Sequence, residues 1–281
     1  MRLAMQDPCR IVTGILTVAL MLVPAAARSQ ELDSAPEQVP LFGDTFESGN
    51  VCNWSSGAGF PQVCPYNFFC AGAPAPTSAA DPLMLTGALT DFLSGNPIGG
   101  ATVEARRQSG GTLLDSDTTV ADGSFSLSAS TGGIPLSAYL AIVAASYPST
   151  YLYPADPFAA DAVGLGVRAI STSSLSLAYF FAGLGVQTPN TGTTVILVAD
   201  CDGVPIQGAT VAFAPAAGAL RYLESGTPSP SATATDATGA AMGFNAPPGN
   251  TSLSALFNGV SLESHSFVVY SSGLTGTLIH P

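Results

Sequence analysis

The stretch Pro97-Ile98-Gly99-Gly100-Ala101-Thr102-Val103 returns, with one substitution, as Pro205-Ile206-Gln207-Gly208-Ala209-Thr210-Val211, 108 residues further along the chain. Each copy follows a short apolar run that ends in Asp and Gly, and each leads into a segment in which apolar and polar residues alternate. Pro and Gly favour a tight turn, and a period of two predicts a strand with one buried face. The repeat therefore predicts two domains of similar plan, each containing a strand, a turn and a second strand.

Several other stretches carry strand patterns. Ala101, Val103 and Ala105 fall on one face of the strand that follows the first turn. The stretch 136–145 is apolar at both parities, which is typical of a strand buried on both faces. Strands are also predicted at 84–91, 101–108, 112–120, 125–129, 192–200, 267–270 and 274–279. A short helix is predicted near 173–182, with Thr172 as N-cap and Gly183 as the residue after the C-cap.

The repeated pattern resembles the carboxypeptidase regulatory-like (transthyretin-like) β-sandwich. In the first copy the resemblance rests on 85–91, 95–97, 100–103 and 122–125. In the second copy it rests on Val198, Asp200, Gly203, Pro205, 208–211, Thr235, Asp236, Gly239, Phe244, Pro248 and Gly249. The resemblance implies two antiparallel Ig-like sandwiches in tandem, in an all-β exported protein, as non-catalytic companion domains. The matching order of strand, Pro turn, Gly-Ala-Thr-Val and Asp/Gly turn predicts that the two copies superpose as independent sandwiches that unfold separately, with Val103 equivalent to Val211 and Phe125 near Phe244.

The N-terminus has the pattern of a secretory signal peptide over residues 1–27. Arg2 and Arg10 precede an apolar stretch, 11–23, which is short for a membrane span, and small residues follow up to Ala27. The 281-residue chain is acidic, with a formal charge of −12 and no Lys, so nucleic acid is not an expected partner. We expect a secreted, periplasmic or cell-surface protein without stable membrane insertion of the mature chain; an uncleaved N-terminal anchor is the alternative.

The predicted domain plan has four parts after the signal peptide. Residues 28–82 form an irregular segment and linker, 83–158 the first sandwich, 159–190 a connector with the short helix, and 191–281 the second sandwich. The irregular segment contains Leu41-Phe42-Gly43-Asp44-Thr45-Phe46-Glu47-Ser48-Gly49-Asn50 and the single Trp of the chain, Trp54. This stretch resembles a Gly-Asp-x-Phe-Glu-Ser-Gly…Trp segment near the ends of many exported bacterial proteins. It is interpreted as a small hairpin that packs on a neighbour, or alternatively as a surface-recognition element.

Cys9 lies within the predicted signal peptide, which leaves Cys52, Cys64, Cys70 and Cys201. In an oxidising compartment an even set is usually paired, and four cysteines allow three connectivities. Complete pairing must link Cys201 to the N-terminal segment, and Cys70 or Cys52 is the expected partner. The other two cysteines would then close a short local loop. The alternative is one local disulfide with two free thiols.

The sequence offers little for catalysis. There are two histidines, His265 and His280, no Gly-x-Ser-x-Gly motif, and an Asp200-Cys201-Asp202-Gly203 stretch that is interpreted as a turn because later calcium ligands are missing. No metal or cofactor site is predicted, and the chain is not expected to be an enzyme. The leading hypothesis is a structural, adhesive or ligand-binding role, with an unknown envelope protein or glycan as partner. The alternative is a carbohydrate-binding accessory protein that stacks sugars on Tyr147, Tyr151 and Tyr153; a hydrolase that uses His265 is a third hypothesis.

Overall fold

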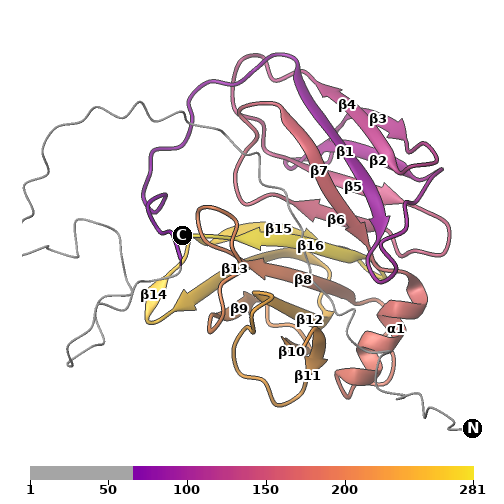
Figure 1. Ribbon diagram of the computed structural model, residues 1–281, viewed down its shortest axis with the longest axis vertical. Coiled ribbons are helices and arrows are strands. Elements are labelled where there is room, and N and C mark those ends of the chain that lie inside the picture. Colours follow the sequence, from indigo (N-terminus) through magenta and orange to yellow (C-terminus); the bar gives the residue numbers. More distant parts are fainter. Residues whose placement is uncertain (1–65) are drawn as a thin grey trace, which may run out of the picture.

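The computed structural model describes residues 66–281 (Figure 1). The signal peptide, the segment with Phe46 and Trp54, and Cys52 and Cys64 lie outside the described residues. The first half of the described chain forms β1 (Leu83–Asp91), β2 (Thr102–Arg107), β3 (Leu113–Thr118), β4 (Ser124–Ala129), β5 (Ala138–Val143), β6 (Thr150–Tyr153) and β7 (Ala162–Ala169).

The second half begins with the helix α1 (Thr172–Phe181). It continues with β8 (Gly192–Val198), β9 (Thr210–Ala214), β10 (Ala219–Glu224), β11 (Thr227–Ser229), β12 (Ala240–Ala246), β13 (Gly249–Phe257), β14 (Val260–Ser261), β15 (His265–Val269) and β16 (Leu274–Ile279). The described chain is therefore an all-β protein with two tandem sandwiches and one short helix. The stretch 159–190, expected as a connector, contributes β7 to the first sandwich before α1 begins; its two glycines, Gly164 and Gly166, interrupt the apolar alternation in the sequence.

The two halves repeat the same strand order. In the first, β4-β1-β7 forms one sheet, and β2, β5 and β6 are neighbours in the other. In the second, β12-β8-β16 occupies the place of β4-β1-β7, and β9, β13 and β15 occupy that of β2, β5 and β6. Val103 in β2 and Val211 in β9 consequently lie at equivalent positions, as the repeat predicts.

The repeated turn is held by a threonine hydroxyl in each half. Ala101 N donates to Thr119 Oγ1 at 2.9 Å, and that hydroxyl donates to Ile98 O at 2.7 Å. The second copy repeats the arrangement, because Ala209 N donates to Thr235 Oγ1 at 2.9 Å and this hydroxyl donates to Ile206 O at 2.6 Å. The threonine thus satisfies one backbone donor and one backbone acceptor where the chain leaves the turn and no strand partner is available.

Phe125 and Phe244 lie in equivalent strands, β4 and β12, but three positions apart in register. Phe125 follows Gly123 by two residues and pairs with Gly87 of β1, whereas Ala241 follows Gly239 by two residues and pairs with Ile196 of β8. Ala241 is therefore the counterpart of Phe125, and Phe244 lies further along β12. The turn glycine sets the register, and the sequence pattern around the phenylalanine does not reveal it.

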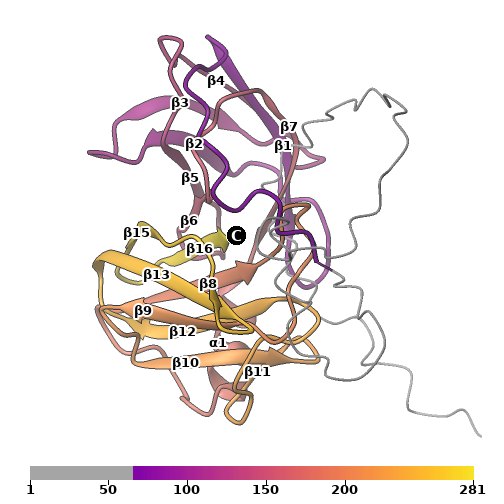
Figure 2. The same ribbon diagram turned by 90° about the vertical axis from the view of Figure 1, so that its left-hand side faces the viewer.

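A single nine-stranded sheet runs through both sandwiches, in the order β11-β10-β12-β8-β16-β6-β5-β2-β3. The join is made by β16, which pairs in parallel with β8 on one side and with β6 on the other. The other parallel pair is β1 with β7, and the remaining pairs of named strands are antiparallel. Figure 2 shows β16 between β6 and β8, where the two sandwiches meet.

The sheet has a hydrophobic core on each face. Leu140 and Ile142 of β5 and Val195 of β8 belong to the core that the sheet shares with β4-β1-β7 and α1. Their chain neighbours Ala141 and Ile196 belong to the core that the sheet shares with β9, β13 and β15. Successive residues of a strand point to opposite faces, so the side chains on both faces of these central strands are buried, as the apolar stretch 136–145 predicts.

The helix caps differ slightly from the expected ones. Ser171, one residue before the expected Thr172, is the N-cap, and its Oγ accepts from Ser174 N. At the C-terminus Gly183 has φ +74°, Gly183 N donates to Phe180 O, and Leu184 N donates to Tyr179 O. This is the Schellman arrangement, which needs a left-handed residue and thus favours glycine. Among the described residues, no helix is long and apolar enough to cross a membrane.

Candidate functional site

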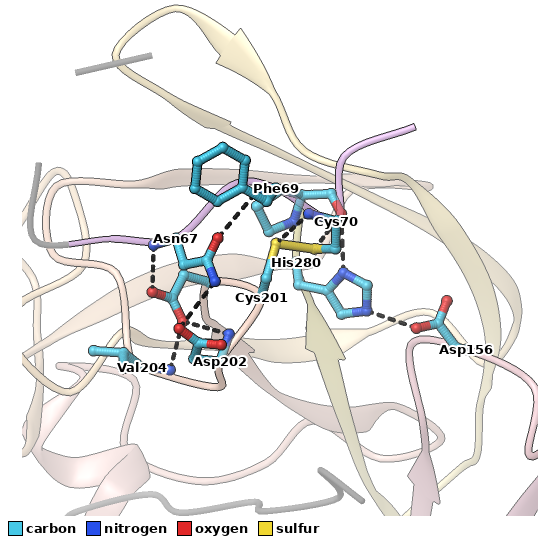
Figure 3. The surroundings of a disulfide bond; sticks show 10 residues. Asn67, Phe69, Cys70, Asp156, Cys201, Asp202, Val204 and His280 are labelled. Carbon is cyan, nitrogen blue, oxygen red and sulfur yellow. Dashed lines mark hydrogen bonds and ion pairs between the residues drawn. A yellow bond between two sulfur atoms is a disulfide. The ribbon is translucent and has the colours of Figure 1, made fainter. Parts of the chain in front are cut away.

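The most elaborate set of polar and covalent contacts surrounds a disulfide at the end of β8. Cys70 and Cys201 are bonded, with an S–S distance of 2.05 Å, and lie 131 residues apart in sequence (Figure 3). The bond attaches residues 66–70, which precede the first sandwich, to the turn between β8 and β9 in the second. We call residues 66–70 together with the turn 200–204 the clasp. The expected link from Cys201 to the N-terminal side is present, and Cys70 is the partner.

Asp200 organises the turn of the clasp. It is 3% exposed, and Asn67 N donates to its Oδ2 at 2.7 Å. Its Oδ1 accepts from Asp202 N at 3.0 Å and from Val204 N at 2.8 Å. A buried carboxylate requires such donors, since burying an unpaired charge is very costly. The residues that the structure describes contain no cluster of three His, Cys, Asp or Glu placed to hold a metal ion.

Residues 66–70 pack as a part of the second sandwich. Phe68 is 4% exposed and stacks on Phe257 of β13, with ring centroids 5.8 Å apart. Tyr66 Oη accepts from Gln207 N at 2.9 Å, and Asn67 O accepts from Cys201 N at 2.9 Å. The disulfide is therefore reinforced by a buried ring and by backbone hydrogen bonds, and it does not stand alone as a tether.

The C-terminus is held at the same place by an ion pair. His280 Nε2 lies 2.8 Å from Asp156 Oδ2, in the loop between β6 and β7 (Figure 3). The hydrogen bond to Asp156 raises the pKa of His280, and the same bond lowers the pKa of Asp156. The pair joins the end of the second sandwich to the first sandwich, close to the clasp.

His265 lies in β15 and has a different environment. Its Nε2 is 2.6 Å from Thr277 Oγ1 of β16. Burial, and to a smaller extent the neighbouring His280, lower the pKa of His265 to about 4. The imidazole is thus neutral near pH 7 and bonded to a threonine within the sandwich, which is the role of a structural histidine. Among the described residues, no carboxylate is hydrogen-bonded to its ring.

The three tyrosines proposed for sugar stacking are engaged by neighbouring residues. Tyr147 Oη donates to Asp91 Oδ2 at 2.9 Å. The ring of Tyr151 stacks on Tyr270, with centroids 3.6 Å apart. Tyr153 is 1% exposed, and its Oη lies 3.4 Å from Tyr270 Oη. Burial raises the pKa of Tyr153 to about 12. These residues do not form an exposed row of rings.

Tyr151 and Tyr153 instead join Tyr139 and Tyr270 in a cluster where the two sandwiches meet. Tyr270 Oη donates to Tyr139 Oη at 3.1 Å, and Tyr139 stacks on Tyr153 with centroids 4.8 Å apart. Nearby, Arg106 pairs with Glu104 at 2.7 Å on the same face of β2. The sequence pattern did not single out Tyr139 or Tyr270. For Tyr139, the only sequence signal was its position in the stretch 136–145, which is apolar at both odd and even positions.

Sequence reasoning also missed Asn67 and the His280–Asp156 pair. Asn67 lies in a stretch without strand or helix pattern, and its partners, Asp200 and Asp202, are more than 130 residues away. Asp156 and His280 are 124 residues apart. No local pattern connects such residues. The bonds of Asn67 follow from the packing of residues 66–70 on the second sandwich, and the His280–Asp156 pair follows from how β16 returns to the first sandwich.

Comparisons with known proteins give likenesses of fold. No family model matches the sequence, and no curated protein sequence matches it. The Bacillus anthracis TIE protein is 16% identical over 71% of this chain, which spans about a third (34%) of that protein, with a TM-score of 0.23. Shaft pilin SpaA from Lactobacillus rhamnosus GG is 11% identical over 73% of this chain and 98% of its own, with a TM-score of 0.22. Hydroxyquinol 1,2-dioxygenase from Pseudomonas putida DLL-E4 is 12% identical over 46% of this chain and 70% of its own, with a TM-score of 0.25. At these scores the likenesses carry no argument about function.

Proposed function

We propose that this chain is an exported, non-enzymatic β-sandwich protein with a structural or adhesive role at the bacterial envelope or outside the cell. The observation that carries the proposal is the clasp around Cys70–Cys201. Structural disulfides form and persist in oxidising compartments, outside the cytosol. The resemblance of the repeat to carboxypeptidase regulatory-like domains and the signal-peptide pattern support the same compartment and role.

The arrangement of the sheets supports a load-bearing or presenting role. The strand β16 joins both sandwiches in one sheet, and the His280–Asp156 pair and the clasp tie down the two ends of the described chain. Such a body holds its loops in a constant relative position. A protein that presents a recognition surface, or that transmits force between two attachments, requires this rigidity.

The proposal is tested by a binding measurement on the purified exported chain. We expect saturable binding to whole cells or isolated envelope fractions, and no binding by the same chain after reduction, alkylation and unfolding. Turnover of ester, glycoside or peptide substrates, or the absence of any saturable binding, would overturn it. A glycan array distinguishes the carbohydrate alternative: glycan binding that is lost in Tyr147→Ala would favour sugar recognition over a protein partner.

A further inference from the structure

The helix α1 is apolar on two opposite faces. Leu175, Tyr179 and Ala182 face the sandwich and are buried. On the other side Leu177, Phe180 and Phe181 are 48%, 69% and 44% exposed. These three residues have the i, i+3, i+4 spacing of neighbours on a helix face, and we call them the helix patch. A surface helix normally carries polar residues there, and one that is apolar all round is normally buried.

The surroundings of the helix patch are also apolar. Val186, five residues beyond the helix, is 79% exposed. The whole stretch 169–199 contains no Asp, Glu, Lys or Arg. Single exposed apolar residues are common, but a contiguous group on an uncharged element is typical of a surface that another segment covers.

We propose that the segment 41–54, with Phe42, Phe46 and Trp54, docks on the helix patch of its own chain. The first argument is where the described chain begins. Tyr66 is held at the clasp, at the end of β8, and α1 precedes the start of the same strand. The clasp therefore anchors the preceding segment to the sandwich that carries the helix patch.

The second argument is reach. β8 has seven residues and is about 23 Å long at the usual rise of a strand. Eleven residues separate Trp54 from Tyr66, and the twelve steps between their Cα atoms span up to about 40 Å when extended. The segment can thus pass the length of β8 and reach α1. Attachment within one chain gives an effective concentration of the order of millimolar, which favours this occupant over a second copy in dilute solution.

The third argument is that the segment needs a surface. It carries the only Trp of the chain and two Phe among Gly, Ser, Asn and acidic residues. Pieces of chain shorter than about 40 residues rarely bury their own apolar side chains without help. Figure 1 shows α1 at the margin of the second sandwich, with one side turned away from the sheets. The helix patch offers uncharged rings and a leucine to the two phenylalanines and the tryptophan.

The single Trp makes the test direct. Selective excitation of the full purified chain reports on Trp54 alone. We expect emission at short wavelengths and protection from a soluble quencher, both lost in Leu177→Ser/Phe180→Ser/Phe181→Ser. The matched control is Ile134→Ser/Val143→Ser/Val163→Ser, three exposed apolar residues of the first sandwich, which should leave the emission unchanged. Circular dichroism verifies that both variants are folded.

A reciprocal variant makes the result independent of the helix substitutions. In Phe46→Ser/Trp54→Ser the uncovered helix patch should bind a hydrophobic dye more strongly, and amides of α1 should exchange faster. Solvent-like emission of wild-type Trp54, or an unchanged emission in the helix-patch variant, would overturn the proposal. So would a dimer, or binding to phosphatidylcholine vesicles, that the helix-patch variant abolishes while Trp54 emission stays constant; these outcomes would assign the helix patch to a second copy or to a membrane.

Discussion

Two glycines at equivalent turns lie against a backbone carbonyl. A Cβ at Gly123 would collide with Leu89 O, and a Cβ at Gly239 would collide with Val198 O. Both residues have positive φ, +79° and +65°. We predict that Gly123→Ala and Gly239→Ala each lower the free energy of unfolding by about 2–4 kcal/mol, since backbone strain and overpacking add. Urea denaturation measures the loss.

Gly132 provides the control for this pair. Its φ is +64°, but a Cβ there would have no atom within 4 Å. Gly132→Ala should therefore lower the free energy of unfolding by only about 1 kcal/mol, because it adds backbone strain at positive φ but no steric collision. Equal losses at Gly123 and Gly132 would contradict a close approach as the cause.

His265 makes the stability depend on pH. Its pKa is lowered to about 4 in the folded protein, mainly by burial, from an ordinary value of 6.5. Between these values the unfolded chain binds the proton and the folded chain does not, so stability falls as pH decreases. We predict a loss of up to about 3 kcal/mol between pH 6.5 and 4. His265→Gln, which cannot be protonated, should lack this part of the pH dependence in urea titrations.

His280 has the opposite effect on the pH dependence of stability, and it serves as a comparison for His265. Its bond to Asp156 raises its pKa, so its stabilising contribution is complete below the unfolded pKa and is lost as pH rises through the folded one. His280→Gln should therefore cost more stability in mild acid than in mild alkali. The same pH profile for the two histidine variants would contradict the assigned environments.

At the scale of elements, the open edge of the first sandwich is closed by two carboxylates of β3. Asp115 Oδ2 accepts from Ser128 N at 2.6 Å, and Asp117 Oδ2 accepts from Ser126 N at 2.8 Å. Both donors belong to β4, which is the edge strand of the β4-β1-β7 sheet within residues 66–281. Unpaired edges invite pairing with other chains, and the aspartates occupy the donors that would do so.

The clasp is the element-scale link that we expect to matter most for stability. Cys70–Cys201 closes a loop with a sequence separation of 131 residues. Loop-closure entropy predicts that Cys70→Ser/Cys201→Ser loses about 5 kcal/mol of unfolding free energy. Urea denaturation of the oxidised proteins measures it. Non-reducing peptide mapping should find the two cysteine peptides joined, also in Cys52→Ser/Cys64→Ser; a Cys201 peptide with an alkylated thiol would refute the link.

At the scale of the whole molecule, the shared sheet changes the expectation for unfolding. Two tandem domains predict two separate transitions. However, β16 belongs to the second sandwich and supplies four residue pairs to β6 of the first. Both faces of its sheet are buried, because every residue of β16 is buried. Unfolding of the second sandwich would thus expose one edge and part of the core of the first.

We predict a single calorimetric transition, with equal calorimetric and van't Hoff enthalpies. Val103→Asp and Val211→Asp bury an unpaired carboxylate in the first and second sandwich, respectively, at a cost of several kcal/mol. Each should lower the midpoint of the same transition. Two transitions, of which each substitution removes only one, would show that the sandwiches unfold independently in spite of β16.

The sequence alone determined most strands of the first sandwich, the helix, and the first and last strands of the second sandwich. Alternation located β1, β2, β4 and β15 within a few residues, and a both-parity apolar run located β5. The repeated Pro-Ile-x-Gly-Ala-Thr-Val located the equivalent turns, since turn chemistry and strand periodicity are local properties. Complete pairing of the four remaining cysteines predicted a link from Cys201 to the N-terminal side.

Only the tertiary structure decided how these elements are joined. The choice of Cys70, the pairing of β16 with β6, and the bonds from Asn67 to Asp200 and from His280 to Asp156 connect residues more than 120 positions apart. Of the tyrosines that looked available for a ligand, Tyr153 is buried and Tyr151 is half-buried against the core of the second sandwich, whereas Tyr147 is half-buried in the first sandwich and bonded to Asp91. These features depend on which faces and edges meet, and a one-dimensional pattern records only whether a face is apolar, not what covers it.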